Sequence, residues 1–177
     1  MRRIAFVSLA AITLLIHSTS AAPAREPLAV RIVPTRHDET SGRGIELRVP
    51  PNHFQVVVTN VSNQNLRLWR EWCSWGYFNL SFEATDQNGR TVTVSKREQG
   101  WDKNFPDPIL VLPGEHLVYE VSFDEDKWKN SPTVGLKGVK TIKMQAIFEI
   151  KPDKHALEKE VWTGRVTSPT NSYTLRK

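Results

Sequence analysis

The chain has 177 residues, of which 39% are hydrophobic and 24% are charged. This composition is typical of one globular domain and excludes a disordered chain or an integral membrane protein. The formal net charge is +5, but Lys and Arg residues are interspersed with Asp and Glu instead of forming long basic runs. We therefore expect no nucleic-acid partner, because such a partner requires positive charge concentrated on one face.

The N-terminal segment has the three parts of a secretory signal peptide. Arg2 and Arg3 supply positive charge, residues 4–16 are almost entirely apolar, and Ala22 and Ala24 are small residues suited to a cleavage site. The apolar stretch is shorter than the roughly 20 residues that a membrane-spanning helix needs. We therefore expect a signal peptide over residues 1–24, no membrane span, and a secreted or periplasmic mature protein.

Beyond this segment, apolar residues recur mostly with a period of two, which is typical of half-buried strands. The first expected strands cover residues 28–33, 45–49, 54–59 and 66–69. The clearest alternation follows, with one apolar face made of Phe78, Leu80, Phe82 and Ala84. Asn79 belongs to the opposite, polar face and begins the second of two sequons, the first of which begins at Asn60.

The second half of the chain continues this pattern. The turn at Asn88-Gly89 predicts a hairpin to a strand at 91–94, and an irregular loop with Pro106 and Pro108 begins near Arg97. Further strands are expected at 109–112, 117–123, 139–150, 161–166 and 172–175, with one helical segment at 153–159. Many short strands without alternating helices predict an all-β, immunoglobulin-like antiparallel β-sandwich of about 8–9 strands, formed by one domain over residues 25–177.

Three short segments resemble parts of secreted bacterial immunoglobulin-like modules. Residues 54–60 (FQVVVTN) look like the second strand and turn of these modules, and residues 111–115 (VLPGE) like the turn before a new strand. Residues 162–168 (WTGRVTS) are similar to their last strand. The cysteine pair of antibody domains is absent. The resemblance implies the fold and an exported setting, and it carries over no functional residue.

The sequence contains none of the common catalytic or metal-binding motifs. G-x-S-x-G, H-E-x-x-H, C-x-x-C and the phosphate-binding P-loop are all absent, and the histidines lie on different expected elements. The three acids at 124–126 lack the glycine typical of a calcium loop, so we expect a solvated turn. We predict a non-enzymatic protein without metal or cofactor.

The single cysteine, Cys73, excludes an internal disulfide and any zinc site that needs several cysteines. It lies between Trp72 and Ser74 in a segment rich in bulky residues, which favours a buried, inert thiol. Two alternatives are a nucleophile paired with one of the histidines and an intermolecular disulfide.

The segment from residue 67 to residue 82 is the most informative part of the sequence. Three of the six tryptophans lie within seven residues there, at Trp69, Trp72 and Trp75. Their spacing of three suits a helix, but Gly76 and the alternation after it favour a wide connection between strands. A second aromatic loop contains Trp101, and a binding role gains support if the two loops lie side by side.

These aromatic residues either fill the space between sheets or form a binding surface. The candidate binding residues are Trp69, Arg70, Glu71, Trp72, Trp75, Tyr77 and Trp101. We favour, among binding functions, an interaction module that engages an envelope or extracellular protein through sheet edges and these loops. The alternative is a carbohydrate-binding module, in which Trp72, Trp75 and Trp101 stack on the sugar rings of a polysaccharide.

Overall fold

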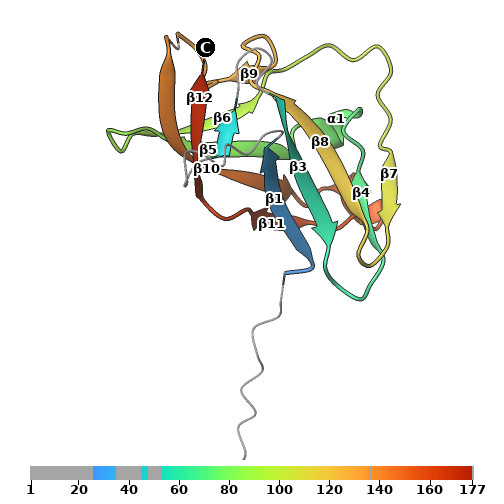
Figure 1. The fold of residues 1–177 in the computed structure, drawn as a ribbon. Helices are drawn as coiled ribbons and strands as arrows, with labels where there is room; N and C mark the ends of the chain where they lie inside the picture. Colours follow the sequence, from blue (N-terminus) through green and yellow to red (C-terminus); the bar gives the residue numbers. More distant parts are fainter. Residues whose placement is uncertain (1–25, 35–44, 48–52, 136, 177) are drawn as a thin grey trace, which may run out of the picture.

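The computed structural model describes residues 26–34, 45–47, 53–135 and 137–176, and its fold is shown in Figure 1. Within these residues the chain forms the strands β1 (Leu28–Pro34), β2 (Ile45–Leu47), β3 (His53–Asn60), β4 (Leu66–Trp69), β5 (Leu80–Thr85), β6 (Thr91–Lys96), β7 (Pro108–Val111), β8 (His116–Ser122), β9 (Trp128–Lys129), β10 (Val139–Ile150), β11 (Gly164–Thr167) and β12 (Asn171–Arg176). Two short helices are α1 (Ser74–Tyr77) and α2 (Lys154–Glu158). The expected all-β class is confirmed. Residues 1–24, the predicted signal peptide, lie outside the described part of the chain.

The strands form three sheets. One sheet has the order β1-β3-β8, and a second has the order β2-β12-β10-β5-β6-β9 with β11 also paired to β10. The strands β4 and β7 form a small third sheet. The pairs among the described strands are antiparallel except for β12 with β2. In Figure 1 the three-stranded sheet passes in front of β5 and β10, which gives the molecule a sandwich-like arrangement.

The alternation of the sequence explains which side of each strand is buried. Leu28, Val30 and Ile32 of β1 and every second residue of β3 and β5 face inward. Between the sheets lies a cluster of aromatic rings, whose edge-to-face contacts have centroid distances of 5.1–6.0 Å. Its members are Phe54, Phe82, Phe123 and Trp128. Large aromatic side chains contribute strongly to a core, so this cluster holds the two main sheets together.

Asn60 fixes the corner where the chain leaves β3 for β4. Its Nδ2 donates to the carbonyls of Gln64 and Val111 at 2.7 and 2.9 Å, and its Oδ1 accepts from the Ser62 hydroxyl at 2.7 Å. The Asn60 carbonyl accepts from the Gly114 N–H in the turn between β7 and β8. One buried side chain therefore binds two turns together and sets the positions of β4, β7 and β8.

Each strand expected from the sequence overlaps a strand of the structure, but the total is twelve because some strands are very short. β9 was not expected, since its two residues show no alternation. The strand expected from residue 161 begins at Gly164, because Val161 instead forms an isolated bridge with Arg67. The expected helix is present as α2. None of the helices in the described ranges has the length and apolar composition needed to cross a membrane.

Candidate functional site

The connection between β4 and β5 contains α1 rather than the wide irregular segment that we expected. The N–H groups of Gly76 and Tyr77 both donate to the carbonyl of Cys73, which closes one helical turn. A Cβ atom on Gly76 would lie 2.0 Å from the carbonyl oxygen of Arg70, so this close approach requires glycine. The connection therefore folds back tightly on itself.

This helical turn delays the start of the alternation that follows it. Leu80, Phe82 and Ala84 are buried as expected, but Phe78 is exposed and Asn79 is buried, which reverses the prediction for these two residues. The reversal arises because β5 begins only at Leu80, so residues 78 and 79 do not belong to the strand.

The three clustered tryptophans take three different positions. Trp69 is buried, with 1% of its surface exposed, and Trp75 is half-buried between Trp69 and His155, with centroid distances of 6.2 and 5.0 Å. Trp72 is 57% exposed. The regular spacing thus produces no common platform, and only Trp72 presents most of its indole to a partner.

The loop that contains Trp101 lies beside this connection. Trp101 contacts Tyr77 edge-to-face at 5.5 Å. The Asn104 side chain accepts from the Ser74 N–H at 2.9 Å, and the Arg70 Nε lies 3.2 Å from the Asp107 carboxylate. The sequence left the relative position of the two aromatic loops open, and their adjacency favours a binding surface.

Beneath the connection, Lys96 is a buried cation. Its ammonium group pairs with the Glu71 carboxylate and lies 4.4 Å from the centroid of the Tyr77 ring. Burial, with a smaller contribution from the charge of Glu71, raises the pKa of Tyr77 above its usual value. Because an unpaired buried charge is costly, Glu71 and Tyr77 have a structural role in addition to any binding role.

Cys73 is fully buried, and its Sγ lies 3.2 Å from the carbonyl oxygen of Arg70. The burial agrees with the expected inert thiol, and an intermolecular disulfide would require an accessible sulfur. The acids at 124–126 lie in an exposed turn. Among the described residues, no group of three or more His, Cys, Asp or Glu side chains is arranged to hold a metal ion.

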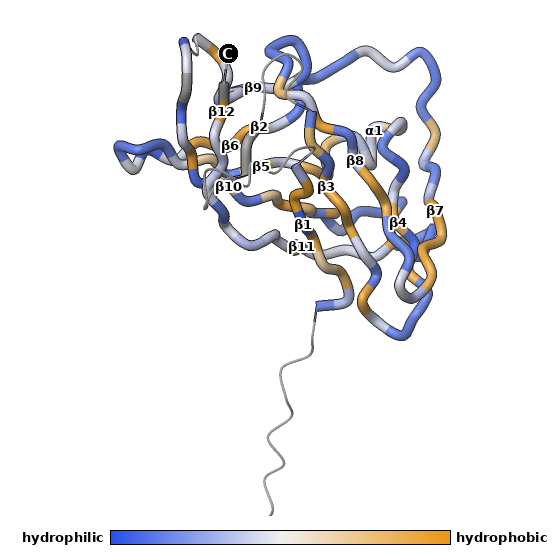
Figure 2. The backbone as a smooth tube through the Cα atoms, in the orientation of Figure 1, coloured by the Kyte–Doolittle hydropathy of each residue, from blue (hydrophilic) through white to orange (hydrophobic). Residues whose placement is uncertain are grey.

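An apolar surface surrounds Trp72. A hollow of about 160 Å³ lies between Trp72 and residues of β7 and β8, and a second of about 360 Å³ lies inside the bend from β7 to β8. Both hollows include Ile109 and Leu117, so they adjoin each other at these two residues. We call this area the Trp72 surface, and its apolar members are Trp72, Ile109, Leu110, Leu117 and Val118. The orange stretches of β7 and β8 in Figure 2 follow it.

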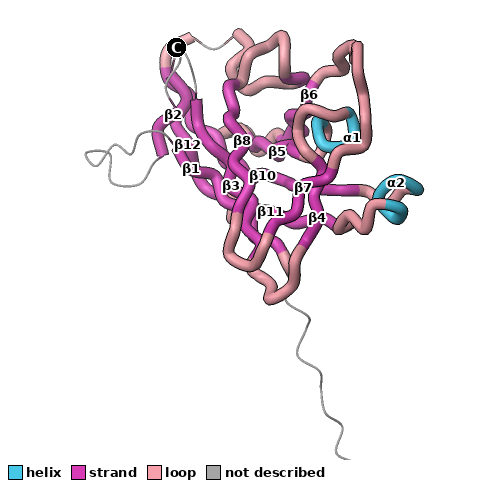
Figure 3. The backbone as a smooth tube through the Cα atoms, turned by 90° about the vertical axis from the view of Figure 1, so that its right-hand side faces the viewer, coloured by secondary structure: helices cyan, strands magenta, loops and turns pink. Residues whose placement is uncertain are grey.

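The Trp72 surface adjoins two sheet edges. Among the described strands, β8 pairs only with β3 and β7 only with β4, so each leaves one backbone edge without a partner strand. Figure 3 shows β4 and β7 with the two short helices beside them. The sequence pattern indicated Trp72 but not Ile109, Leu117 or Val118. These three residues lie near Trp72 because the corner at Asn60 sets the positions of β7 and β8.

A separate pocket, of about 340 Å³, lies beside α1. We call it the Trp75 pocket, and it includes Trp75, Phe78, Asn79, Ser81, Glu149 and Asp153. Asn79 is 7% exposed, and its buried Nδ2 has no hydrogen-bond partner among the described residues. Of the residues expected to bind, only Trp69 and Trp75 line this pocket, while Phe78 and Asn79 were assigned to the wrong faces.

No protein-family model matches the chain, and comparisons with curated proteins and with solved structures find no significant similarity. Functional inference therefore starts from the Trp72 surface and the Trp75 pocket.

Proposed function

We propose that this chain is an exported, non-enzymatic interaction module with an immunoglobulin-like sandwich, and that it binds a protein of the cell envelope or extracellular space. The observation that carries the proposal is the exposed indole of Trp72 on an apolar surface beside two sheet edges. Tryptophan is among the residues that dominate the binding energy of protein interfaces.

The surroundings of Trp72 suit a protein partner. Leu110 and Val118 are about half exposed. Leu110 lines the larger of the two hollows and Val118 the smaller, so each adds apolar area to the Trp72 surface. Arg70 and Glu71 stand at its border, where polar residues can orient a partner. The unpaired backbone groups of β8 offer hydrogen bonds to an added strand of the partner.

The test compares Trp72→Ala with Val134→Ala, an exposed apolar residue near the opposite end of the sandwich. Immobilised wild-type protein and both variants are exposed to envelope extract of the producing cells, and the affinity of any retained protein is then measured after its purification. We expect Trp72→Ala to weaken binding about 30-fold or more and Val134→Ala to leave it unchanged. Equal affinity of the wild type and Trp72→Ala for every retained protein would contradict the proposal.

The Trp75 pocket favours carbohydrate binding as a second candidate function. It combines two aromatic side chains, Trp75 and Phe78, with hydroxyl and carboxylate groups and the Asn79 Nδ2, which has no partner within the described part of the chain. Aromatic rings pack against the apolar face of a sugar, while polar groups bind its hydroxyls. This pocket differs from the earlier hypothesis, because it does not contain Trp72 or Trp101.

A sedimentation assay with chitin, cellulose and peptidoglycan tests this candidate. Phe78→Ala removes an exposed wall of the pocket, and Phe105→Ala is the matched control because Phe105 is also exposed but does not line the pocket. If the carbohydrate function is correct, at least one of the three materials retains the wild-type protein. The same material should retain Phe105→Ala but not Phe78→Ala. Retention of none of them, or equal loss in both variants, would argue against it.

A further inference from the structure

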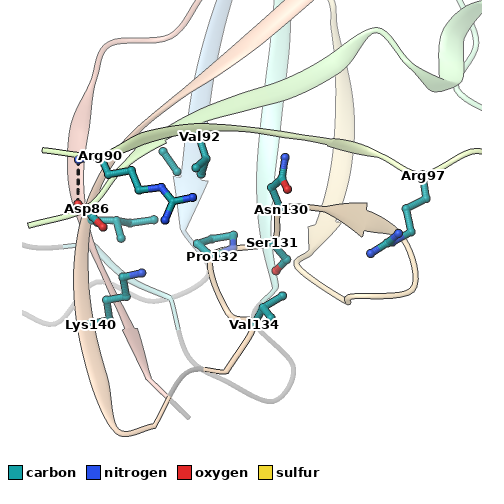
Figure 4. A pocket seen from close by; sticks show the side chains of 11 residues that line it. Asp86, Arg90, Val92, Arg97, Asn130, Ser131, Pro132, Val134 and Lys140 are labelled. Carbon is teal, nitrogen blue, oxygen red and sulfur yellow. Dashed lines mark hydrogen bonds between the residues drawn. The ribbon is translucent and has the colours of Figure 1, made fainter. Parts of the chain in front are cut away.

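A further hollow, of about 510 Å³, lies at the end of the sandwich that contains the turn between β5 and β6. Figure 4 shows this hollow, and Figure 1 places the turn on the opposite side of the molecule from β7. Its floor is apolar, with Ala84 from β5, Val92 from β6 and Ile142 from β10. Residues 130–134 border it.

Three cations stand around this apolar floor: Arg90, Arg97 and Lys140. Arg90 and Lys140 extend over the floor from one side, and Arg97 extends toward Ser131 from the other (Figure 4). Neither the Arg90 guanidinium nor the Lys140 ammonium has an ion pair or hydrogen bond with another described residue. Arg97 donates from Nε to the carbonyl of Glu125 at 2.7 Å, and its other guanidinium nitrogens make no hydrogen bond with the described residues.

One acid, Asp86, accompanies the three cations. Its carboxylate accepts the N–H groups of Asn88 and Arg90 at 2.9 Å each, so it is already engaged by the turn. The hollow therefore has an excess of two positive charges. Like charges gathered around one hollow repel one another, and an anion bound among them removes this repulsion.

We propose that this hollow, the basic hollow, binds a phosphate monoester whose apolar part packs on Ala84, Val92 and Ile142. Guanidinium groups bind phosphate through paired hydrogen bonds, and an ammonium group adds a point charge. A phosphate monoester carries a charge of about −1.5 to −2 at pH 7, which matches the excess charge of the hollow. Arg90 and Lys140 hold the phosphate, while Arg97, which lies at the other end of β6 from Arg90, adds positive charge across the hollow. This site is independent of the Trp72 surface.

The test is isothermal titration calorimetry at low salt, with hexyl phosphate as the probe. Methyl phosphate and inorganic phosphate test the contribution of the apolar floor to binding, because they lack the hexyl chain. Hexanoate tests the need for two negative charges. Vesicles of phosphatidic acid in phosphatidylcholine distinguish a lipid headgroup from a free ester. The variants are Arg90→Gln and Lys140→Gln, singly and together. Lys159→Gln is the control, because Lys159 is exposed and does not line the hollow.

We expect hexyl phosphate to bind more tightly than the other small anions. Each single substitution should weaken binding about tenfold, the double substitution more, and Lys159→Gln should have no effect. Binding to the vesicles as well would identify a lipid headgroup as the source of the phosphate, and binding to hexyl phosphate alone a free ester. No binding of any phosphate ester, or equal binding by the double variant, would overturn the proposal. Equal affinity for hexanoate or inorganic phosphate would overturn the assigned ligand class.

Discussion

The two sides of the connection between β4 and β5 differ sharply in what they do. The inner side holds Trp69, Cys73 and the Glu71–Lys96 pair, whose removal would leave cavities or an unpaired charge. The outer side presents Trp72, which lies next to an open hollow and supports little of the core. Trp69 and Trp72 are only three residues apart, yet Trp69 stabilises the core, whereas Trp72, as we propose, binds a partner.

The largest expected effect is on the inner side. Trp69→Ala should lower the free energy of unfolding by about 3–5 kcal/mol, because the indole is fully buried and the surrounding sheets cannot collapse around the cavity. Urea denaturation followed by circular dichroism measures the loss. A loss of less than about 1 kcal/mol would mean that Trp69 is not part of the core, since that value is typical of surface positions.

Removal of Glu71 and removal of Lys96 should lower the free energy of unfolding by different amounts. The Lys96 side chain is 8% exposed and the Glu71 side chain 41% exposed, so Glu71→Ala leaves a buried cation whereas Lys96→Met leaves a carboxylate that water can reach. We expect a destabilisation of about 3 kcal/mol for Glu71→Ala and about 1 kcal/mol for Lys96→Met. The same denaturation experiment compares them, and the reverse order would contradict the described burial.

Tyr119→Phe should stabilise the protein slightly. The Tyr119 hydroxyl is buried and has no hydrogen-bond partner in the described ranges, so its removal should add about 1 kcal/mol to the free energy of unfolding at neutral pH. Burial, and to a lesser degree the nearby Glu71 and Cys73, raises the pKa of Tyr119 above the ordinary value of 10.0. The unfolded chain therefore releases this proton first, and stability declines as the pH rises above about 10.

Thermal denaturation of the wild type and Tyr119→Phe between neutral pH and pH 11 tests this expectation. The wild type should lose more stability at alkaline pH than the variant, because the variant lacks one of the phenols whose pKa is raised. An equal alkaline loss in both proteins would show that Tyr119 does not contribute.

The smallest effect on stability is expected on the outer side. Trp72→Phe should change the free energy of unfolding by less than about 0.5 kcal/mol, as is usual for exposed side chains. It should nevertheless remove the largest component of tryptophan fluorescence that acrylamide quenches, because Trp69 and Trp128 are buried. Trp75→Phe is the matched control, and a greater loss of quenching in that variant would reverse the assignment of the exposed indole.

Alternation of apolar residues was sufficient to predict most of the strands and the all-β class, because a half-buried strand repeats every two residues. It failed at Phe78 and Asn79, where the tight turn at Gly76 shifts the start of β5. The turn depends on a close contact with the carbonyl of Arg70, and a contact between backbone atoms leaves no periodic signal.

The candidate site was only partly predictable for a related reason. The exposure of Trp72 and the burial of Trp69 depend on where neighbouring strands lie, which no local pattern reveals. Ile109 and Leu117 belong to segments about 40 residues away from Trp72 in the sequence, and they reach it only through the long-range pairings of β7 with β4 and β8 with β3. Lys140 of the basic hollow comes from β10, while Arg90 and Arg97 lie just before and just after β6, so spacing along the chain gave no sign of them.

The corner at Asn60 has a practical consequence for production of the protein. Asn60 and Asn79 both begin glycosylation sequons, and both side chains are buried. In a eukaryotic secretory host, a glycan attached to either side chain during synthesis would have no room in the folded protein. Ser62→Ala removes the first sequon but also the hydroxyl that donates to Asn60 Oδ1. A bacterial host therefore preserves the corner that aligns β7 and β8, whereas secretion from eukaryotic cells sets glycosylation in competition with folding.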